Sequence, residues 1–234
     1  MKAVGLVALA LVIGTVMMAS AQEEQYAYSA NAVGVIRKTI PAGKMVLVTM
    51  PFDDMMSTNA AIPFLELPFL SSLPNKSEAN MWDAVSSKWV TGTKSLGKWS
   101  GAITNLSLGL GDAIFFLNGS KNDVTITMLG DVPTDSSIAI QVVPANHITG
   151  CANPYPSSFV FTNSVLAKQS KNGTMVSFWD VNTSQWQSLS KSLNKWSGAT
   201  NMVVEPGVAF LYQSGKSDTN TSWTVVRPYT WTGM

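Results

Sequence analysis

The only histidine and the only cysteine of the chain lie four residues apart, at His147 and Cys151. A cysteine and a histidine act as nucleophile and base when the imidazole reaches the sulfur and a third group orients the imidazole. One residue of each type cannot build a structural zinc site or a disulfide framework. We therefore expect no catalytic residue, no cofactor and no metal. Cys151 is expected to be buried, with pairing between chains as the alternative.

Two carboxylates, Asp83 and Asp180, each follow a tryptophan in matching sequence surroundings. Paired carboxylates about 5–10 Å apart hydrolyse glycosidic bonds. An aspartate directly after a strand more commonly caps a turn by accepting hydrogen bonds from nearby backbone N–H groups. We favour the turn cap. Because His147 is the only histidine available to a Ser–His–acid triad and no G-x-S-x-G motif is present, the sequence predicts a protein that is not an enzyme.

Six of the eight tryptophans occur in three matched pairs, Trp82/Trp179, Trp89/Trp186 and Trp99/Trp196. Exposed aromatic rings bind sugars, whereas buried rings fill a core once their N–H groups find partners. The first and third pairs are expected in the core of their own repeat. The second pair is flanked by polar residues, so Trp89 and Trp186 are the candidate ligand contacts.

These pairs belong to a tandem repeat. Residues 81–102 and 178–199 align without gaps and are identical at 12 of 22 positions. The match continues where residues 111–116 align with 207–212, and it begins near Ile40 and Val143. The predicted organisation is a signal peptide (1–21), a linker (22–32), a first module (33–133), a second module (136–228) and a C-terminal tail (229–234).

The sequence of each module predicts β-structure, with Gly and Pro between short strands. Strands are expected at 44–50, 112–117 and 124–128, and at their counterparts in the second module. Helical turns are expected within 61–73 and 158–169. Asn118-Gly119 and Ser214-Gly215 predict hairpin turns with positive φ. The fold class is therefore all-β with minor helix: two tandem homologous β-sandwich or small-barrel modules that pack together, because a unit of about 95 residues is marginally stable alone.

The order of motifs resembles the repeats of uncharacterised secreted proteins of environmental bacteria, with the pattern N-x-V-G-Y…P-x-G…N-P. Asn31, Val33 and Gly34 fit the pattern, and Val35 replaces its tyrosine. The second module keeps Asn153-Pro154. The resemblance implies secretion and a β-rich repeat, and no activity.

The N-terminus predicts export. A basic start at Lys2 precedes an apolar run, and Ala19-Ser20-Ala21 fits a signal-peptidase site, which leaves no membrane span after cleavage. A membrane anchor is the alternative. The expected location is the extracellular space or the cell surface, or the periplasm. Only 12% of residues are charged and the net charge is +1, so we expect no nucleic-acid partner.

The functional prediction is a secreted, non-enzymatic structural or adhesive protein of two β modules. The alternative is a carbohydrate-binding protein that uses exposed tryptophans. Low charge favours self-association, and the tryptophans favour surface glycans, so these are the two expected partners.

Overall fold

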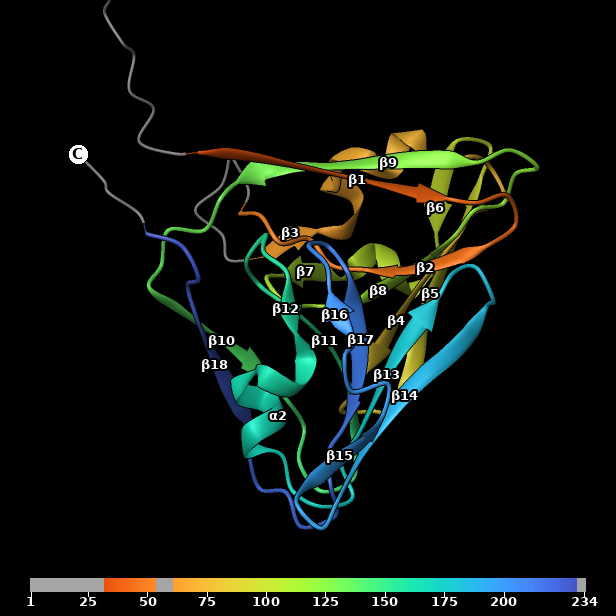
Figure 1. Cartoon of the computed structure of the whole chain (residues 1–234). Helices are drawn as coiled ribbons and strands as arrows, with labels where there is room; N and C mark the ends of the chain where they lie inside the picture. Colours follow the sequence, from red (N-terminus) through yellow and green to blue (C-terminus); the bar gives the residue numbers. More distant parts are fainter. Residues whose placement is uncertain (1–31, 54–60, 231–234) are drawn as a thin grey trace, which may run out of the picture. The chain divides into compact units, whose positions relative to one another are not determined.

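The computed structural model describes residues 32–53 and 61–230 (Figure 1). The expected signal peptide (1–21) lies outside the described residues, as does nearly all of the linker. Both modules lie within one compact unit of the chain, Asn31–Gly233. None of the helices in the described ranges has the length and apolar character needed to cross a membrane.

The first module is built from three antiparallel sheets. A five-stranded sheet has the order β2-β8-β4-β5-β6, and β1-β9 and β3-β7 are two-stranded. Its strands are β1 (Val33–Ile40), β2 (Met45–Val48), β3 (Ala61–Pro63), β4 (Glu78–Asp83), β5 (Lys88–Ser95), β6 (Lys98–Ser100), β7 (Ser107–Gly109), β8 (Ile114–Leu117) and β9 (Val124–Asp131). Three 3-10 helices, η1 (Phe64–Glu66), η2 (Pro68–Ser72) and η3 (Ala102–Asn105), complete it.

The second module repeats this topology. Its five-stranded sheet has the order β11-β17-β13-β14-β15, with β10-β18 and β12-β16 as the two-stranded sheets. Its strands are β10 (Ser137–Gln141), β11 (Ile148–Ala152), β12 (Phe159–Val160), β13 (Met175–Asp180), β14 (Gln185–Ser192), β15 (Lys195–Gly198), β16 (Val203–Val204), β17 (Ala209–Gln213) and β18 (Ser222–Val226). Its helices are η4 (Phe161–Asn163) and α2 (Val165–Gln169). The predicted all-β fold of two sandwich-like modules is confirmed.

Each module has its own core, formed by one face of its five-stranded sheet, its two-stranded sheets and its helices. Alternation along β5 explains the division: Gly92 and Lys94 are buried, whereas Thr91, Thr93 and Ser95 are exposed. Both members of the third tryptophan pair pack against these cores, as predicted. The Trp99 ring makes an edge-to-face contact with Phe64, and the Trp196 ring with Phe161.

A buried lysine closes the helical segment of each module. The ammonium of Lys94 donates hydrogen bonds to the carbonyls of Leu70 and Leu73, at the end of η2, at 2.8 and 2.7 Å. The ammonium of Lys191 donates to Ala167 and Ser170 at the end of α2, at 2.8 Å each. The carbonyl of Leu70 also accepts the N–H of Leu73. The other three carbonyls lie at the ends of the helices, where the backbone supplies too few donors, so a cation at this end is favourable.

The predicted hairpins at Asn118-Gly119 and Ser214-Gly215 are wrong. None of these residues has positive φ, because β8 and β17 lead into strands of different sheets. Gly119 is needed for close packing instead, since a Cβ there would lie 2.2 Å from the carbonyl carbon of Lys76. Positive φ occurs at Leu96-Gly97 and Leu193-Asn194, which form the two-residue turns β5–β6 and β14–β15.

The modules contact each other through matched tryptophans. Trp82 Nε1 donates to the carbonyl of Ile148 in the second module, and Trp179 Nε1 donates to the carbonyl of Met45 in the first, both at 2.8 Å. The expectation that Trp82 and Trp179 fill the core of their own module is therefore wrong. Each ring lies on the face of its sheet that is turned away from the core of its own module. Its N–H donates to a backbone carbonyl of the other module.

A small apolar cluster completes this interface. Its buried members from both modules are Leu47, Ala113, Phe115, Ala152 and Ala209. An isolated bridge between Val48 and Val208 adds a backbone contact. The reciprocal pattern resembles a twofold-symmetric dimer interface, in which the same patch is used by both partners.

Candidate functional site

Five aromatic rings gather where the two modules meet. Trp82 and Trp89 are cross-strand partners on β4 and β5, with ring centroids 5.2 Å apart. Trp179 and Trp186 repeat this pair on β13 and β14, also at 5.2 Å. Phe115 lies among them, 5.7 Å from the rings of Trp89, Trp179 and Trp186. The outer rings are thus held on both sides by other aromatic rings.

The predicted ligand contacts are the exposed members of this cluster. Trp89 is 43% exposed and Trp186 is 40% exposed. Both line one groove of about 370 Å³, to which the two modules contribute. The lining residues are Trp82, Trp89, Ile148, Met175, Ser177, Trp186, Ser188, Leu211 and Gln213. The groove is within the size range of small-molecule sites.

The polar groups of the groove are few and uncharged. The hydroxyls of Ser177 and Ser188 share a hydrogen bond of 2.8 Å across β13 and β14. The amide nitrogen of Gln213 donates a hydrogen bond to the side-chain oxygen of Asn146. The amide oxygen of Gln213 is therefore free to accept a hydrogen bond from a ligand. Within the described part of the chain, no hydrogen bond occupies the indole N–H of Trp89 or Trp186. A ligand here meets apolar rings, hydroxyls and an amide.

A ladder of hydroxyls continues from the groove along β14. Ser188, Ser190 and Ser192 are exposed at every second position after Trp186. Side chains two residues apart on a strand are about 6.6–6.8 Å apart and point to the same face. Ser197 on β15 pairs with Ser190, and their hydroxyls are 3.2 Å apart. The sheet face beside the groove is therefore lined with hydroxyls, and its first charged side chain along this ladder is Lys195, the cross-strand partner of Ser192.

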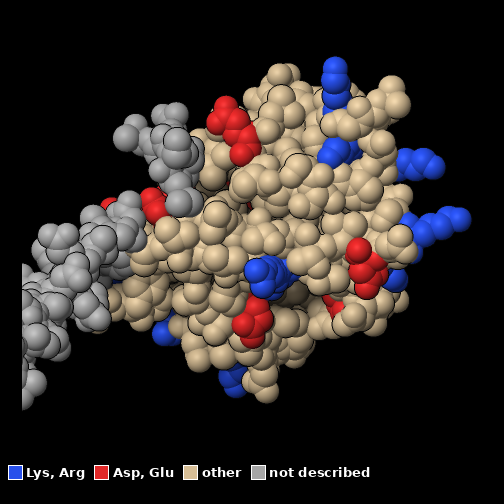
Figure 2. Space-filling view, turned by 90° about the horizontal axis from the view of Figure 1, so that it is seen from above, with Lys and Arg blue, Asp and Glu red and all other residues tan. Residues whose placement is uncertain are grey.

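Charged groups do not gather around this site. The groove lining contains no Lys, Arg, Asp or Glu. Figure 2 shows one face of the molecule from above, where basic and acidic residues are scattered over a mainly uncharged surface. The site offers no electrostatic attraction to a strongly charged ligand.

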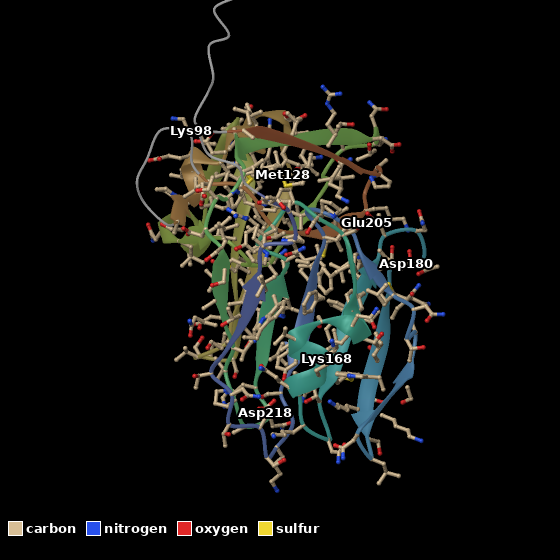
Figure 3. All side chains as sticks on the ribbon, turned by 60° about the vertical axis from the view of Figure 1, so that its left-hand side comes forward. Lys98, Met128, Lys168, Asp180, Glu205 and Asp218 are labelled. Carbon is tan, nitrogen blue, oxygen red and sulfur yellow. The ribbon has the colours of Figure 1, made fainter. Side chains whose placement is uncertain are left out.

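The matched carboxylates are turn caps. Asp83 accepts the backbone N–H of Val85 at 2.9 Å and the Ser86 hydroxyl at 2.6 Å. Asp180 accepts the N–H of Asn182 at 2.9 Å, in the β13–β14 turn where Figure 3 labels it. Hydrogen bonds within each turn lower the pKa of both carboxyls. The largest contribution comes from the side chain of Ser86 for Asp83 and from the side chain of Thr183 for Asp180. The turn-cap interpretation is confirmed, and neither carboxylate lines the groove.

Cys151, the cysteine of the His147 and Cys151 pair, is buried. Cys151 lies on β11 with its side chain in the core of the second module, at 0% exposure. Burial raises the pKa of its thiol, with nearby Asp112 as a secondary cause, so the thiolate needed for nucleophilic attack is disfavoured. The prediction of a buried cysteine is confirmed, and pairing between chains is excluded for this conformation.

A second cavity, of about 390 Å³, lies between the modules and is lined by Trp82, Asp83, Asp112, Gln141 and Thr149 among others. Burial raises the pKa of Asp112, and the N–H of Gly109, 2.8 Å from its carboxylate, partly offsets the shift. Asp83 is engaged in its own turn. The described residues contain no group of three or more His, Cys, Asp or Glu side chains arranged to hold a metal ion.

Replacing Asp112 with asparagine should flatten the stability profile in acid. Because the folded state raises this pKa, it binds the proton more tightly than the unfolded chain, so the ionised carboxyl destabilises the fold as pH rises through the two pKa values. Asp112→Asn removes the destabilising contribution of the ionised carboxyl and keeps an acceptor for the N–H of Gly109. We expect equal or greater stability than the parent at pH 7, measured by urea unfolding from about pH 4 to pH 7.

Asp83→Asn is the matched control for that experiment, because the pKa of Asp83 is shifted the other way. Its carboxylate stabilises the fold above the unfolded pKa, and that contribution is lost as pH falls through the folded pKa. The control should therefore be less stable than the parent at pH 7. A clear loss of stability in Asp112→Asn at pH 7 would contradict the assigned sign.

Comparison of the chain with protein-family models, with curated proteins and with solved structures finds no match. The site is therefore defined by its geometry.

Sequence reasoning located Trp89 and Trp186 and missed the residues that shape the groove around them. Leu211 and Phe115 occupy matching positions on β17 and β8, and nothing in their local sequence assigns them to an interface. The serine ladder was detectable, because Ser188, Ser190 and Ser192 alternate with residues of the core. A ligand contact by the two tryptophans stays a prediction.

Proposed function

We propose that the protein is a secreted, non-enzymatic adhesive protein that binds neutral carbohydrate in the groove between its two β modules. The observation that carries the proposal is the groove itself, which exposes Trp89 and Trp186 beside uncharged hydroxyl and amide groups. Secretion rests on the N-terminal sequence. Retention on a glycan-coated surface is the adhesive role that such a groove supports.

The chemistry of the groove matches that of a sugar ring. A pyranose with mostly equatorial hydroxyls has apolar C–H faces, which pack on an indole, and a polar rim, which needs hydrogen bonds. Trp89 and Trp186 supply rigid aromatic area and two unoccupied N–H donors. Ser177, Ser188 and Gln213 supply hydroxyls and an amide oxygen. Because no charged side chain lines the groove, a neutral hexose is favoured over a uronic acid or a sulfated sugar.

The rings are also held in place before a ligand arrives. Trp89 packs on Trp82 and Phe115, and Trp186 packs on Trp179 and Phe115. Trp82 and Trp179 are in turn held by hydrogen bonds across the interface. Little side-chain entropy is then lost on binding, which favours affinity from a small contact area.

The test is calorimetric titration with β-1,4-linked hexasaccharides of glucose and of mannose, with an oligogalacturonate of equal length as the charged comparison. We expect saturable binding of a neutral hexasaccharide and none of the galacturonate. Trp89→Ala and Trp186→Ala should each weaken binding at least about tenfold, equivalent to about 1.4 kcal/mol or more. Leu193→Ala, in the exposed β14–β15 turn, is the control and should bind as the parent does.

Two results would overturn the proposal. One is the absence of binding to both neutral hexasaccharides at millimolar concentration by a folded protein. The other is unchanged affinity in Trp89→Ala and Trp186→Ala, which would place any glycan contact elsewhere. Thermal unfolding of each variant, measured alongside, separates lost contact from lost fold.

A further inference from the structure

The groove occupies only one of two positions that the repeat makes equivalent. Its floor consists of Ser177 on β13, Ser188 on β14 and Leu211 on β17, which are cross-strand neighbours. The same places in the first module are held by Asn80 on β4, Thr91 on β5 and Phe115 on β8, which are also cross-strand neighbours. Asn80 and Thr91 are as capable of hydrogen bonding as the two serines.

The walls are equivalent as well. Trp82 and Trp89 come from the first module to stand beside the floor of the second. In return Trp179 and Trp186 of the second module reach Phe115 of the first, with ring centroids 5.7 Å away and nearly perpendicular planes. The aromatic walls of a sugar site are therefore present in both positions.

The floors differ in one large side chain. Phe115 is 3% exposed and its ring fills the space between the tryptophans of both modules. Leu211, at the matching position, is partly exposed and lines the open groove. An aliphatic side chain does not fill the volume of a phenyl ring, so the groove remains open only on the side of Leu211.

We propose that the residue at this matched position decides where glycan binds: Phe115 blocks a second neutral-hexose site in the first module, and Leu211 leaves the site of the second module open. A protein with twofold-related modules thereby binds one short glycan rather than two. This inference rests on the proposed function, since it concerns the stoichiometry and placement of the same ligand.

Three variants test it by calorimetric titration with a neutral β-1,4-linked trisaccharide of the hexose that the parent binds. Leu211→Phe should fill the groove and reduce affinity at least tenfold, although no wall tryptophan is changed. Phe115→Leu should raise the stoichiometry from one trisaccharide per chain to two. The double variant Leu211→Phe/Phe115→Leu should bind one again, now on the first module.

Placement is read from crystals of the double variant soaked with the trisaccharide, where the ring should contact Asn80 or Thr91 rather than Ser177 or Ser188. Unchanged affinity in Leu211→Phe, or a stoichiometry of one in Phe115→Leu, would overturn the inference while leaving the glycan function of the parent intact. Failure of the parent to bind any neutral glycan is instead a failure of the proposed function. Should Leu211→Phe unfold, the stoichiometry of Phe115→Leu still decides the matter, because this change only reduces side-chain volume.

Discussion

Replacement of Trp196 by alanine is expected to lower the free energy of unfolding by about 3–5 kcal/mol, the range found when a large aromatic ring is deleted from a core. The ring packs edge-to-face on Phe161, with centroids 5.2 Å apart, and its N–H donates to the carbonyl of Ala167 at 3.1 Å. The ammonium of Lys191 lies 5.7 Å from the ring centroid. The variant leaves both a cavity and a carbonyl with fewer donors.

Urea unfolding followed by circular dichroism measures this loss, with Trp186→Ala as the matched control. Trp186 is 40% exposed, so its replacement should cost about 1 kcal/mol or less. Equal costs for the two variants would contradict the packing of Trp196 against the core and the exposure of Trp186 at the surface.

The first module offers an internal comparison. Trp99 occupies the matching core position, but its buried Nε1 has no hydrogen-bond partner among the described residues. Trp99→Phe should therefore cost less than Trp196→Phe, because only the latter abolishes a hydrogen bond.

Lys191→Met should be the second most damaging change, with an expected loss of about 1–3 kcal/mol. The side chain is 7% exposed, and its ammonium satisfies the carbonyls of Ala167 and Ser170 at the end of α2. Methionine keeps the apolar stem and removes the donor. The Ala167 carbonyl still accepts from Trp196, whereas the Ser170 carbonyl is left without its donor, and a buried acceptor without a donor costs about 1–3 kcal/mol. Desolvation, with the neighbouring charge of Lys171, lowers the pKa of Lys191, so part of this loss is offset when the buried charge is removed.

The measurement is again urea unfolding, with Lys195→Met as the control. Lys195 is exposed on β15, and its replacement should change stability by less than about 0.5 kcal/mol. Lys94→Met should reproduce the loss in the first module, since Lys94 caps η2 in the same way. A Lys191→Met variant as stable as the parent would show that the hydrogen bonds from Lys191 to the end of α2 do not stabilise the fold.

Local pattern was sufficient to predict much of this molecule. The repeat around Trp82 and Trp179 predicted two modules of one architecture, and alternation along residues 124–128 predicted the strand β9. An alternating strand follows from the two-residue period of its side chains, which their order alone determines. The exposure of Trp89 and Trp186 followed from their polar neighbours in the same way.

Tertiary structure decided what each exposed face meets. The sequence predicted that Trp82 and Trp99 both belong to the core of the first module, and it did not show that the other module covers Trp82 and accepts its N–H at the carbonyl of Ile148. The roles of Phe115 and Leu211 have the same origin: their effect depends on volume in a space bounded by residues about 70 positions or more away along the chain, such as Trp186 for Phe115. Side-chain order determines which way a residue points, whereas packing between distant segments determines whether it fills a gap or leaves a groove.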